Sequence, residues 1–274
     1  MKNIDNKTVD SFGDEWTRFD QSKMTDKEVY KAFEEYFAVF PWDMLSRSSE
    51  GFDMGCGSGR WAKHVAPKVG KLNCVDPSSA IEIAKKQLYK HNNIAFYRDS
   101  IDSINIKKGT QDFGYSLGVL HHVPDTETAI KSCVELLKPG APLLLYLYYS
   151  FDGRPLWFKL LWKISDLFRR IIFRMPPSLK NLITDIIAIF IYFPLAKISL
   201  LFSKLGFSVN DFPLSFYKDH SFYTMRTDSR DRFGTPLEQR FTKDEIHKMM
   251  QNAGLQNILF SNQAPYWCAV GYKE

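Results

Sequence analysis

A glycine-rich turn with a carboxylate in front of it is the part of the sequence best suited to hold a ligand. It runs Asp53-Met-Gly-Cys-Gly-Ser-Gly59, and it ends the short apolar run Gly51–Met54 and precedes a helical pattern. Glycine allows a tight turn with positive φ and lets backbone N–H groups approach a ligand closely. We interpret the turn as a cofactor loop; the alternative is a strand-to-helix turn that binds nothing.

The spacing of the glycines separates this loop from two common phosphate-binding loops. The dinucleotide fingerprint G-x-G-x-x-G would need glycine at position 60, where the sequence has Arg60. The loop G-x-x-x-x-G-K-[ST] is also absent, because no Gly-Lys-Ser/Thr follows. The loop therefore argues against an NAD(P)-dependent oxidoreductase, which stays an alternative.

Two more carboxylates follow later apolar runs. Asp76 ends the run Leu72–Val75, where an acid can accept hydrogen bonds from both ribose hydroxyls of a bound nucleotide or nucleoside. Asp99 follows the run Ile94–Tyr97. Either acid could instead cap a helix, so neither identifies the ligand alone.

Taken together, the motifs between about residues 50 and 150 resemble those of the class I S-adenosyl-L-methionine-dependent methyltransferases. The glycine loop resembles the first motif of that superfamily, Asp112–Val123 is similar to its fourth-strand motif, and Leu136–Gly140 is similar to the turn before its fifth strand. The small-molecule branch with the ubiquinone and menaquinone biosynthesis methyltransferases is the most similar. The resemblance implies methyl transfer from S-adenosyl-L-methionine to an O, C or N atom of a small, partly apolar metabolite.

The resemblance also implies which residues bind the cofactor. Ser11–Trp16 is similar to an N-terminal segment whose aromatic residue closes over the cofactor, and Asp99 stands where the family has a partner for the adenine amino group. A sulfonium cofactor carries positive charge and no phosphate, which suits Asp53 and Asp76. The predicted cofactor-binding residues are Trp16, Asp53, Gly55, Cys56, Gly57, Gly59, Asp76, Pro77, Asp99, Ser100, Leu117 and Gly118.

Methyl transfer from a sulfonium mainly requires alignment of the acceptor, the methyl group and the sulfur. A hydroxyl or an acidic carbon as acceptor also needs a base, and the predicted catalytic residues are His121, His122 and Tyr148. In an extended segment the two histidines point in opposite directions, so one would line the pocket and the other would be structural. No metal site is predicted.

Candidate substrate-binding residues follow a long helical region. They are Tyr217, Tyr223, Arg226 and Arg232. The superfamily places substrate-facing elements at this point of the chain. The alternatives are a solvated charged loop for the segment 226–232 and a packing role for the aromatic side chains.

The elements that must position these residues alternate between strands and helices. The sequence predicts strands at Gly51–Met54, Leu72–Val75, Ile94–Tyr97, Phe113–Leu117 and Leu143–Tyr149, with helices over 60–67, 79–91 and 126–138. This alternation predicts a Rossmann-like, doubly wound α/β sheet that is mostly parallel. A helix opened by Thr242–Glu245 and two strands near 258–260 and 267–270 complete the sheet, the last strand being antiparallel. A capping box at Thr25–Glu28 predicts an N-terminal helix that stops before Pro41.

The segment between residues 151 and 232 interrupts the alternation as a helical insertion. Residues 156–174 form a basic amphipathic pattern with Leu160, Ile164 and Leu167 on one side, and Pro194 should bend or divide a second helical stretch over 179–205. From Arg154 to Leu205 there are nine Lys/Arg and two Asp, a net +7 against +5 for the whole chain. The insertion is a substrate lid, a homodimer interface or a peripheral membrane surface. A membrane span is disfavoured, because the charge-free run 186–196 is shorter than the roughly 20 residues needed.

These patterns predict four regions and a cellular setting. The regions are an N-terminal helical cap (1–45), a cofactor-binding core (46–150), the insertion or lid (151–232) and the last helix and strands (233–274). Four scattered cysteines and an N-terminus without an apolar segment favour a cytoplasmic protein, peripheral to a membrane if the insertion docks there. We expect a small-molecule substrate and no nucleic acid. A membrane-associated scaffold that binds the cofactor without catalysis stays an alternative to the enzyme.

Overall fold

The computed structural model describes residues 3–274 and divides them into two compact units. The first, here called the sheet unit, contains residues 3–21, 29–150 and 237–274. The second, the helical unit, contains residues 22–28 and 151–236. All the predicted cofactor-binding and catalytic residues lie in the sheet unit, and the four predicted substrate-binding residues lie in the helical unit.

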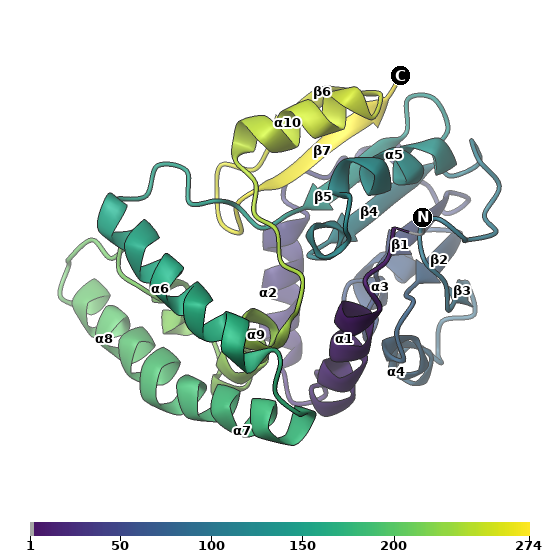
Figure 1. Cartoon of the computed structure of the whole chain (residues 1–274). Coiled ribbons are helices and arrows are strands. Elements are labelled where there is room, and N and C mark those ends of the chain that lie inside the picture. The colour runs from purple at the N-terminus through teal and green to yellow at the C-terminus, as the bar shows by residue number, and fades with distance from the viewer. Residues whose placement is uncertain (1–2) are drawn as a thin grey trace. The chain divides into compact units, whose positions relative to one another are not determined.

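The described part of the sheet unit is built on a seven-stranded sheet in the order β3-β2-β1-β4-β5-β7-β6 (Figure 1). Its strands are β1 (Glu50–Met54), β2 (Lys71–Val75), β3 (Ile94–Tyr97), β4 (Phe113–Leu117), β5 (Pro142–Tyr146), β6 (Leu255–Phe260) and β7 (Cys268–Lys273). β1 to β5 pair in parallel, and β7 pairs antiparallel with β5 and β6. The predicted Rossmann-like α/β fold, with its final antiparallel strand and a helical insertion after β5, is confirmed.

Helices cover both faces of this sheet. They are α1 (Asn6–Arg18), α2 (Asp26–Tyr36), α3 (Ala62–Val65), α4 (Ala80–Gln87), α5 (Thr126–Leu136) and α10 (Lys243–Asn252), with 3-10 turns η1 (Trp42–Met44), η2 (Ala66–Lys68) and η3 (Leu120–His122). Figure 1 shows α5 and α10 side by side on one face, where Leu143 and Leu145 of β5 pack with them. Leu144 points to the other face, among residues of α2, α3 and α4. Strand residues thus alternate between two apolar layers, as the period of a strand requires.

The order of the strands fixes where a ligand can bind. β1 lies between β2 and β4, so the chain leaves β1 toward one edge of the sheet and later returns to its other side. In open α/β sheets, the crevice at the carboxyl ends of the strands at such a switch point is where ligands bind. The glycine loop follows β1, and Asp76, Asp99 and Gly118 follow β2, β3 and β4 at that edge.

The helical unit consists of helices from the insertion together with the first residues of α2. They are α6 (Leu156–Ile172), α7 (Pro177–Ile187), the π-helical segment η4 (Ala188–Tyr192), α8 (Phe193–Lys204), the 3-10 helix η5 (Ser215–Asp219) and α9 (Phe222–Gly234). Pro194 lies in the first turn of α8, directly after the π-helical segment. Pro194 therefore does not divide the second helical stretch, which runs continuously from Pro177 to Lys204; the only irregularity there among the described residues is the π-helical segment before the proline.

The N-terminal helix predicted from Thr25–Glu28 forms as α2, but two local details differ from interpretations of the sequence. The segment 226–232 is not a solvated loop but part of α9, in which Arg230 is fully buried and its Nε donates to Asn181 Oδ1 at 3.0 Å. The capping box at Thr25 is only half formed, with Glu28 N donating to Thr25 Oγ1 at 3.2 Å. The Glu28 carboxylate instead accepts hydrogen bonds from Ser221 at the start of α9, because its side chain turns away from its own helix.

Candidate active site

The glycine loop has the backbone conformation that its sequence predicts. Gly55, Gly57 and Gly59 have φ values of +81°, +53° and +84°. Gly55 N and Cys56 N both donate to Val75 O, at 2.7 and 3.0 Å, which ties the loop to the end of β2. A Cβ on Gly55 would lie 2.4 Å from the side chain of Val119, so that position requires glycine for space as well as for φ.

Asp76 organises the loop from the neighbouring strand. Its Oδ2 accepts from Gly57 N at 2.9 Å, and its Oδ1 accepts from Ser78 N at 2.8 Å and Ser78 Oγ at 2.6 Å. Burial raises the pKa of Asp76, while the hydrogen bonds from Ser78 and Gly57 lower it; the net shift is upward. Asp76 therefore fixes both the turn after β2 and the backbone of the glycine loop.

Asp53 lies at the base of the same loop and is only 1% exposed. Burial, above all, raises the pKa of Asp53 to about 8; the negative charge of Asp76 adds to this, and the Tyr115 hydroxyl and Arg60 oppose it. Its Oδ2 has no hydrogen bond of good geometry among the described residues. The site thus holds a buried carboxyl group that a cationic ligand would stabilise in its charged form.

The N-terminal helix brings an aromatic ring to the loop. A Cβ on Gly57 would lie 3.2 Å from Cε2 of Trp16, so the Trp16 indole lies directly against the loop backbone. Gly13 lets α1 approach the turn after β2, because a Cβ there would lie 2.7 Å from Ser79 Oγ. Trp16 therefore lies where the sequence places the aromatic residue, beside the glycine loop.

The other predicted cofactor residues lie around the same edge of the sheet. Asp99 caps the turn that follows it: its Oδ1 accepts from Ser100 N at 2.9 Å and from Ser103 Oγ. Gly118, after Leu117 at the end of β4, has φ +79° and donates to Tyr146 O at 3.0 Å. Asp99 therefore caps a turn and not a helix, and its contact with adenine stays a prediction.

The two histidines are arranged differently from the sequence expectation. They lie in the 3-10 turn η3, not in an extended segment, so their side chains do not point in opposite directions. The ring centroids of His121 and His122 are 4.0 Å apart, and the His121 ring stacks on Tyr148 at 3.8 Å. The three predicted catalytic residues thus form one aromatic cluster.

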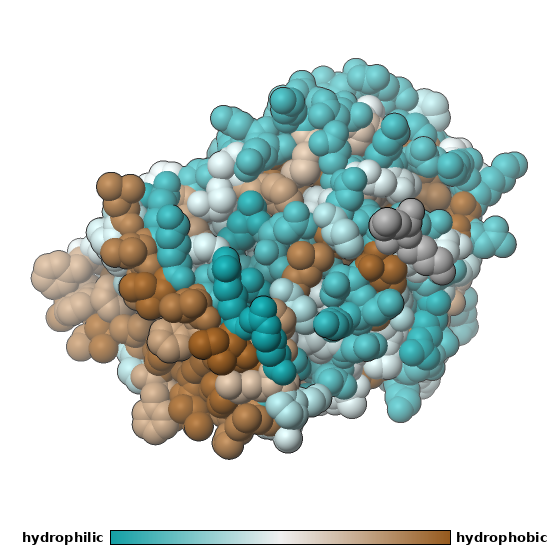
Figure 2. Space-filling model, viewed as in Figure 1, coloured by the Kyte–Doolittle hydropathy of each residue, from teal (hydrophilic) through white to brown (hydrophobic). Residues whose placement is uncertain are grey.

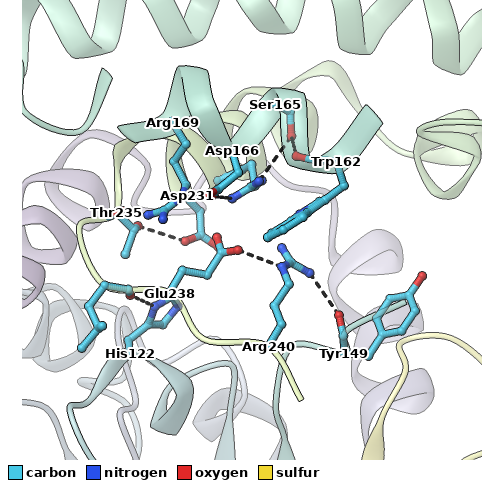
Figure 3. Close-up of polar contacts among 12 residues, drawn as sticks. His122, Tyr149, Trp162, Ser165, Asp166, Arg169, Asp231, Thr235, Glu238 and Arg240 are labelled. Atoms are coloured by element: carbon cyan, nitrogen blue, oxygen red, sulfur yellow. Dashed lines mark hydrogen bonds and ion pairs between the residues drawn. The ribbon is translucent and has the colours of Figure 1, made fainter. Parts of the chain in front are cut away.

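The two histidines differ in their hydrogen bonds and burial. His122 Nδ1 lies 2.7 Å from Leu237 O, and because a carbonyl only accepts, Nδ1 is the donor (Figure 3). This places the lone pair of the neutral ring on Nε2. His121 is fully buried, and burial, then His122 and Arg240, hold its pKa well below the ordinary range.

Arg240, in the linker before α10, completes this cluster, although the sequence does not identify it. The Arg240 guanidinium carbon lies 5.0 Å from the centroid of the Tyr148 ring. Arg240 Nε donates to Glu238 at 2.8 Å, and a second nitrogen donates to Tyr149 O at 3.4 Å (Figure 3). The only signal in the sequence is a pair of charges just before the Thr242–Glu245 capping box, and such a pair is typical of a solvated linker.

The four predicted substrate-binding residues have partners within the helical unit. Tyr217 donates from its hydroxyl to Asp228 at 2.9 Å, and Arg226 forms a bidentate pair with Asp185. The Arg232 guanidinium lies 4.9 Å from the Trp162 ring centroid. The Tyr223 carbonyl accepts from Thr227. These contacts account for their positions, and contact with a substrate stays a prediction.

Residues 52–145 match the family described as "Methyltransferase domain". This part of the chain is a class I S-adenosylmethionine-dependent methyltransferase domain. The match covers β1 to β5, including Asp53, Asp76, the glycine loop and the turn with both histidines.

Curated methyltransferases are similar to part of this chain. A ubiquinone biosynthesis O-methyltransferase from Nitrosospira multiformis is 31% identical over 93 residues, which cover 32% of this chain and 38% of that protein. A norajmaline N-methyltransferase from Rauvolfia serpentina is 32% identical over 120 residues, covering 41% of this chain and 40% of that protein. The chain thus spans about 40% of the length of the curated relatives it matches.

Solved structures extend the likeness of fold beyond the methyltransferase domain. A chain in the complex of the Haloferax volcanii Trm112 methyltransferase activator has a TM-score of 0.55 at 13% identity, covering 95% of this chain and 96% of that chain. Human N-acetylserotonin methyltransferase in complex with SAM has a TM-score of 0.51 at 14% identity, covering 88% of this chain and 51% of that chain. At these identities the similarity shows the fold alone.

Proposed function

We propose that the protein transfers the methyl group of S-adenosylmethionine to an O, C or N atom of a small, partly apolar metabolite. One observation carries the proposal: two buried carboxyl groups, Asp53 and Asp76, flank a glycine loop at the switch point of the sheet. A phosphate ligand would be repelled there, whereas a ligand with an ammonium and a sulfonium is attracted.

The residues of the site suit the parts of this cofactor. Asp76 accepts three hydrogen bonds from the protein, and because a carboxylate offers about four acceptor sites, one is left for a ribose hydroxyl. Asp53 would face the cationic amino-acid part of the cofactor, and Trp16 would cover the cofactor where it lies beside the glycine loop. When bound, the cofactor supplies a methyl group that is already activated, so the protein mainly has to align the acceptor and exclude water.

The cluster of His121, His122 and Tyr148 is the candidate source of a base. His121 stays neutral at physiological pH, but its lowered pKa makes it a weak base. His122 is the better candidate, because its Nδ1 is held by Leu237 O and its basic nitrogen is then Nε2. Tyr148, stacked on His121, would orient the ring pair.

The relatives support a small acceptor molecule as the substrate class. The names of both curated relatives denote methyl transfer within small-molecule metabolism, one to oxygen and one to nitrogen. Because each alignment covers less than half of this chain and of the relative, the relatives do not identify the acceptor. The acceptor itself is therefore part of the proposal only as a class.

Calorimetry with S-adenosylhomocysteine tests the proposal. The protein should bind this product tightly, and Asp76→Ala should weaken binding by at least about tenfold, because the loop loses its anchor as well as a ribose partner. Asp43→Ala is the matched control, since Asp43 is an exposed acid of the same unit. Absence of binding to the unaltered protein would overturn the proposal, and so would equal affinity of the two variants.

A further inference from the structure

The helices α6, α7 and α8 turn polar side chains inward and apolar side chains outward. Their buried residues include Asp166 and Arg169 of α6, Lys180 of α7 and Ser199 of α8. A helix that packs onto an ordinary protein core shows the opposite pattern. The apolar outward face of these helices is therefore not packed against a protein core among the described residues.

A network of charges on α9 explains the inward face. Asp166 of α6 forms an ion pair with Arg232 of α9, whose Nη1 lies 3.7 Å from Asp166 Oδ1, and it also accepts from Arg169 Nε of its own helix at 2.7 Å. On α7, Asp185 forms a bidentate pair with Arg226 of α9, with distances of 3.0 and 2.9 Å. Because α9 packs against both α6 and α7, the charged side of each helix has to face it.

The outward face is apolar over its whole length. Of the 26 large apolar side chains that are exposed among residues 3–274, 20 lie between residues 156 and 207. Figure 2 shows them as a continuous brown area over α6, α7 and α8. Leu167, Phe190 and Leu205 are 62%, 72% and 62% exposed. Soluble monomers rarely expose apolar patches larger than a few hundred Å², so a partner is expected here.

The charges of residues 156–207 indicate what kind of partner this face binds. The exposed charged residues in this range are all basic: Lys163, Arg170, Arg174, Lys197 and Lys204. Its two acids, Asp166 and Asp185, have side chains only 10% and 23% exposed and are engaged with arginines. A broad apolar face bordered by positive charge alone is complementary to a surface that is apolar inside and negative outside.

We propose that α6, α7 and α8 dock the protein onto a lipid bilayer that contains anionic lipids. The helices lie in the plane of the interface, with Leu167, Phe190 and Leu205 among the acyl chains and the basic side chains at the headgroups. A second copy of the chain fits this face less well, because it would bring basic residues against basic residues.

The polar packing of α7 favours lying on the bilayer over crossing it. Pro177–Lys204 is a continuous helical stretch of 28 residues, long and apolar enough to span a membrane by length and composition. The same stretch, however, holds the Asp185 pair with Arg226 and donates from Lys180 to Gly234 O. A spanning helix would carry these groups of α9 into hydrocarbon, whereas an interfacial one keeps them on the aqueous side.

Flotation of the whole chain with lipid vesicles tests the docking. The protein should float with vesicles of phosphatidylcholine and phosphatidylglycerol, less with phosphatidylcholine alone, and less again at high salt. The triple variant Leu167→Gln, Phe190→Gln and Leu205→Gln should abolish flotation. Lys163→Gln and Lys204→Gln should each weaken it by roughly fivefold. The matched control, Tyr89→Gln with Leu259→Gln, alters exposed apolar residues of the sheet unit and should float normally.

Three results would overturn the proposal. One is failure of the unaltered protein to float with either vesicle. Another is a stable dimer in sedimentation that the triple variant converts to monomer, which would assign the face to a second copy. The third is retention in vesicles washed with alkaline carbonate, which would indicate a span. Circular dichroism checks that each variant folds, and S-adenosylhomocysteine binding, measured separately, keeps this proposal independent of the proposed function.

Discussion

The sheet unit has a much larger apolar interior than the helical unit. The interior of the sheet unit is made of residues such as Leu143, Leu144 and Val270, all completely buried. The helical unit buries a small apolar cluster with Met225 and Phe233, and it also buries Arg230, Arg169 and Asp166, while many of its large apolar side chains are exposed. The sheet unit is therefore stabilised mainly by removing apolar surface from water, whereas the helical unit also depends on its buried charges and on whatever covers its outer face.

Truncating one leucine in each unit should give the largest difference between the units in the free energy of unfolding. Leu144→Ala should lower the free energy of unfolding by about 3 kcal/mol, because it leaves a cavity in the sheet unit. Leu167→Ala, at a side chain that is 62% exposed, should change it by less than about 0.5 kcal/mol without lipid. Urea denaturation of both variants measures this. Equal losses would mean that the outer face of α6 is buried in solution.

Removal of a buried acid should affect the helical unit next. Asp166→Asn should cost about 2 kcal/mol, because Arg169 would stay buried without its charged partner and keep only its bonds to carbonyl oxygens such as Thr235 O. Burial raises the pKa of Asp166, but Arg169 and the neighbouring arginines outweigh it, so the net shift is downward. Its contribution to stability is therefore present above the ordinary pKa of aspartate and is lost as pH falls through the lower folded value.

A pH series of thermal unfolding checks this expectation. The difference in melting temperature between the unaltered protein and Asp166→Asn should shrink as the pH falls below about 4. Asp219→Asn is the matched control, since Asp219 pairs with Lys218 at a half-exposed site. Should Asp219→Asn be as costly as Asp166→Asn, the polar interior would not be the source of stability in this unit.

The sequence predicts the sheet unit well and the helical unit poorly, for a physical reason. In the sheet unit, apolar runs, glycines with positive φ and carboxylates at strand ends all indicate the same fold, so Asp53, Asp76 and Gly57 could be found by position alone. α9 has no such signal. Its Arg230 is fully buried and its other arginines and aspartates are half-buried, with partners far away in the chain such as Asp185 and Asn181, whereas a pattern of charges normally indicates a solvated segment.

The same limit explains what was missed near the candidate base. The turn with His121 and His122 was expected to be extended, but a 3-10 turn follows β4 and brings the rings together. Arg240 approaches Tyr148 from a segment that is more than 90 residues later in the chain. Contacts of this kind depend on how loops close over the strand ends, which no local pattern encodes.

Asp53→Asn should make the protein more stable than the unaltered protein as the pH rises, because it removes a buried group that loses stability when it ionises. Since burial raises the folded pKa of Asp53 to about 8, the folded state holds a proton that the unfolded state loses near pH 4, and stability falls as pH rises between these values. The variant lacks this loss, so its advantage in unfolding free energy should grow by about 1.4 kcal/mol for each pH unit between about pH 5 and pH 7.

The same variant should bind the cofactor product less well. In the unaltered protein, the positive amino group of S-adenosylhomocysteine favours the charged form of Asp53, so affinity relative to Asp53→Asn should increase with pH up to about 8. Calorimetry in two buffers of different ionisation enthalpy should detect proton release with the unaltered protein alone. If both proteins bind with the same pH profile, Asp53 does not face the ligand.

Gly57→Ala should have the smallest effect, and a second glycine allows that effect to be divided into two parts. Gly57 has φ +53°, and a Cβ added there would lie 3.2 Å from the Trp16 ring. Gly109 has φ +69°, and a Cβ added there would have no atom within 4 Å. Alanine at either position pays about 1 kcal/mol for the left-handed backbone. Any further loss in Gly57→Ala measures the contact with Trp16, and only this variant should weaken S-adenosylhomocysteine binding. Equal melting temperatures with unchanged binding would show that the indole does not rest on the loop, and that α1 is not part of the site.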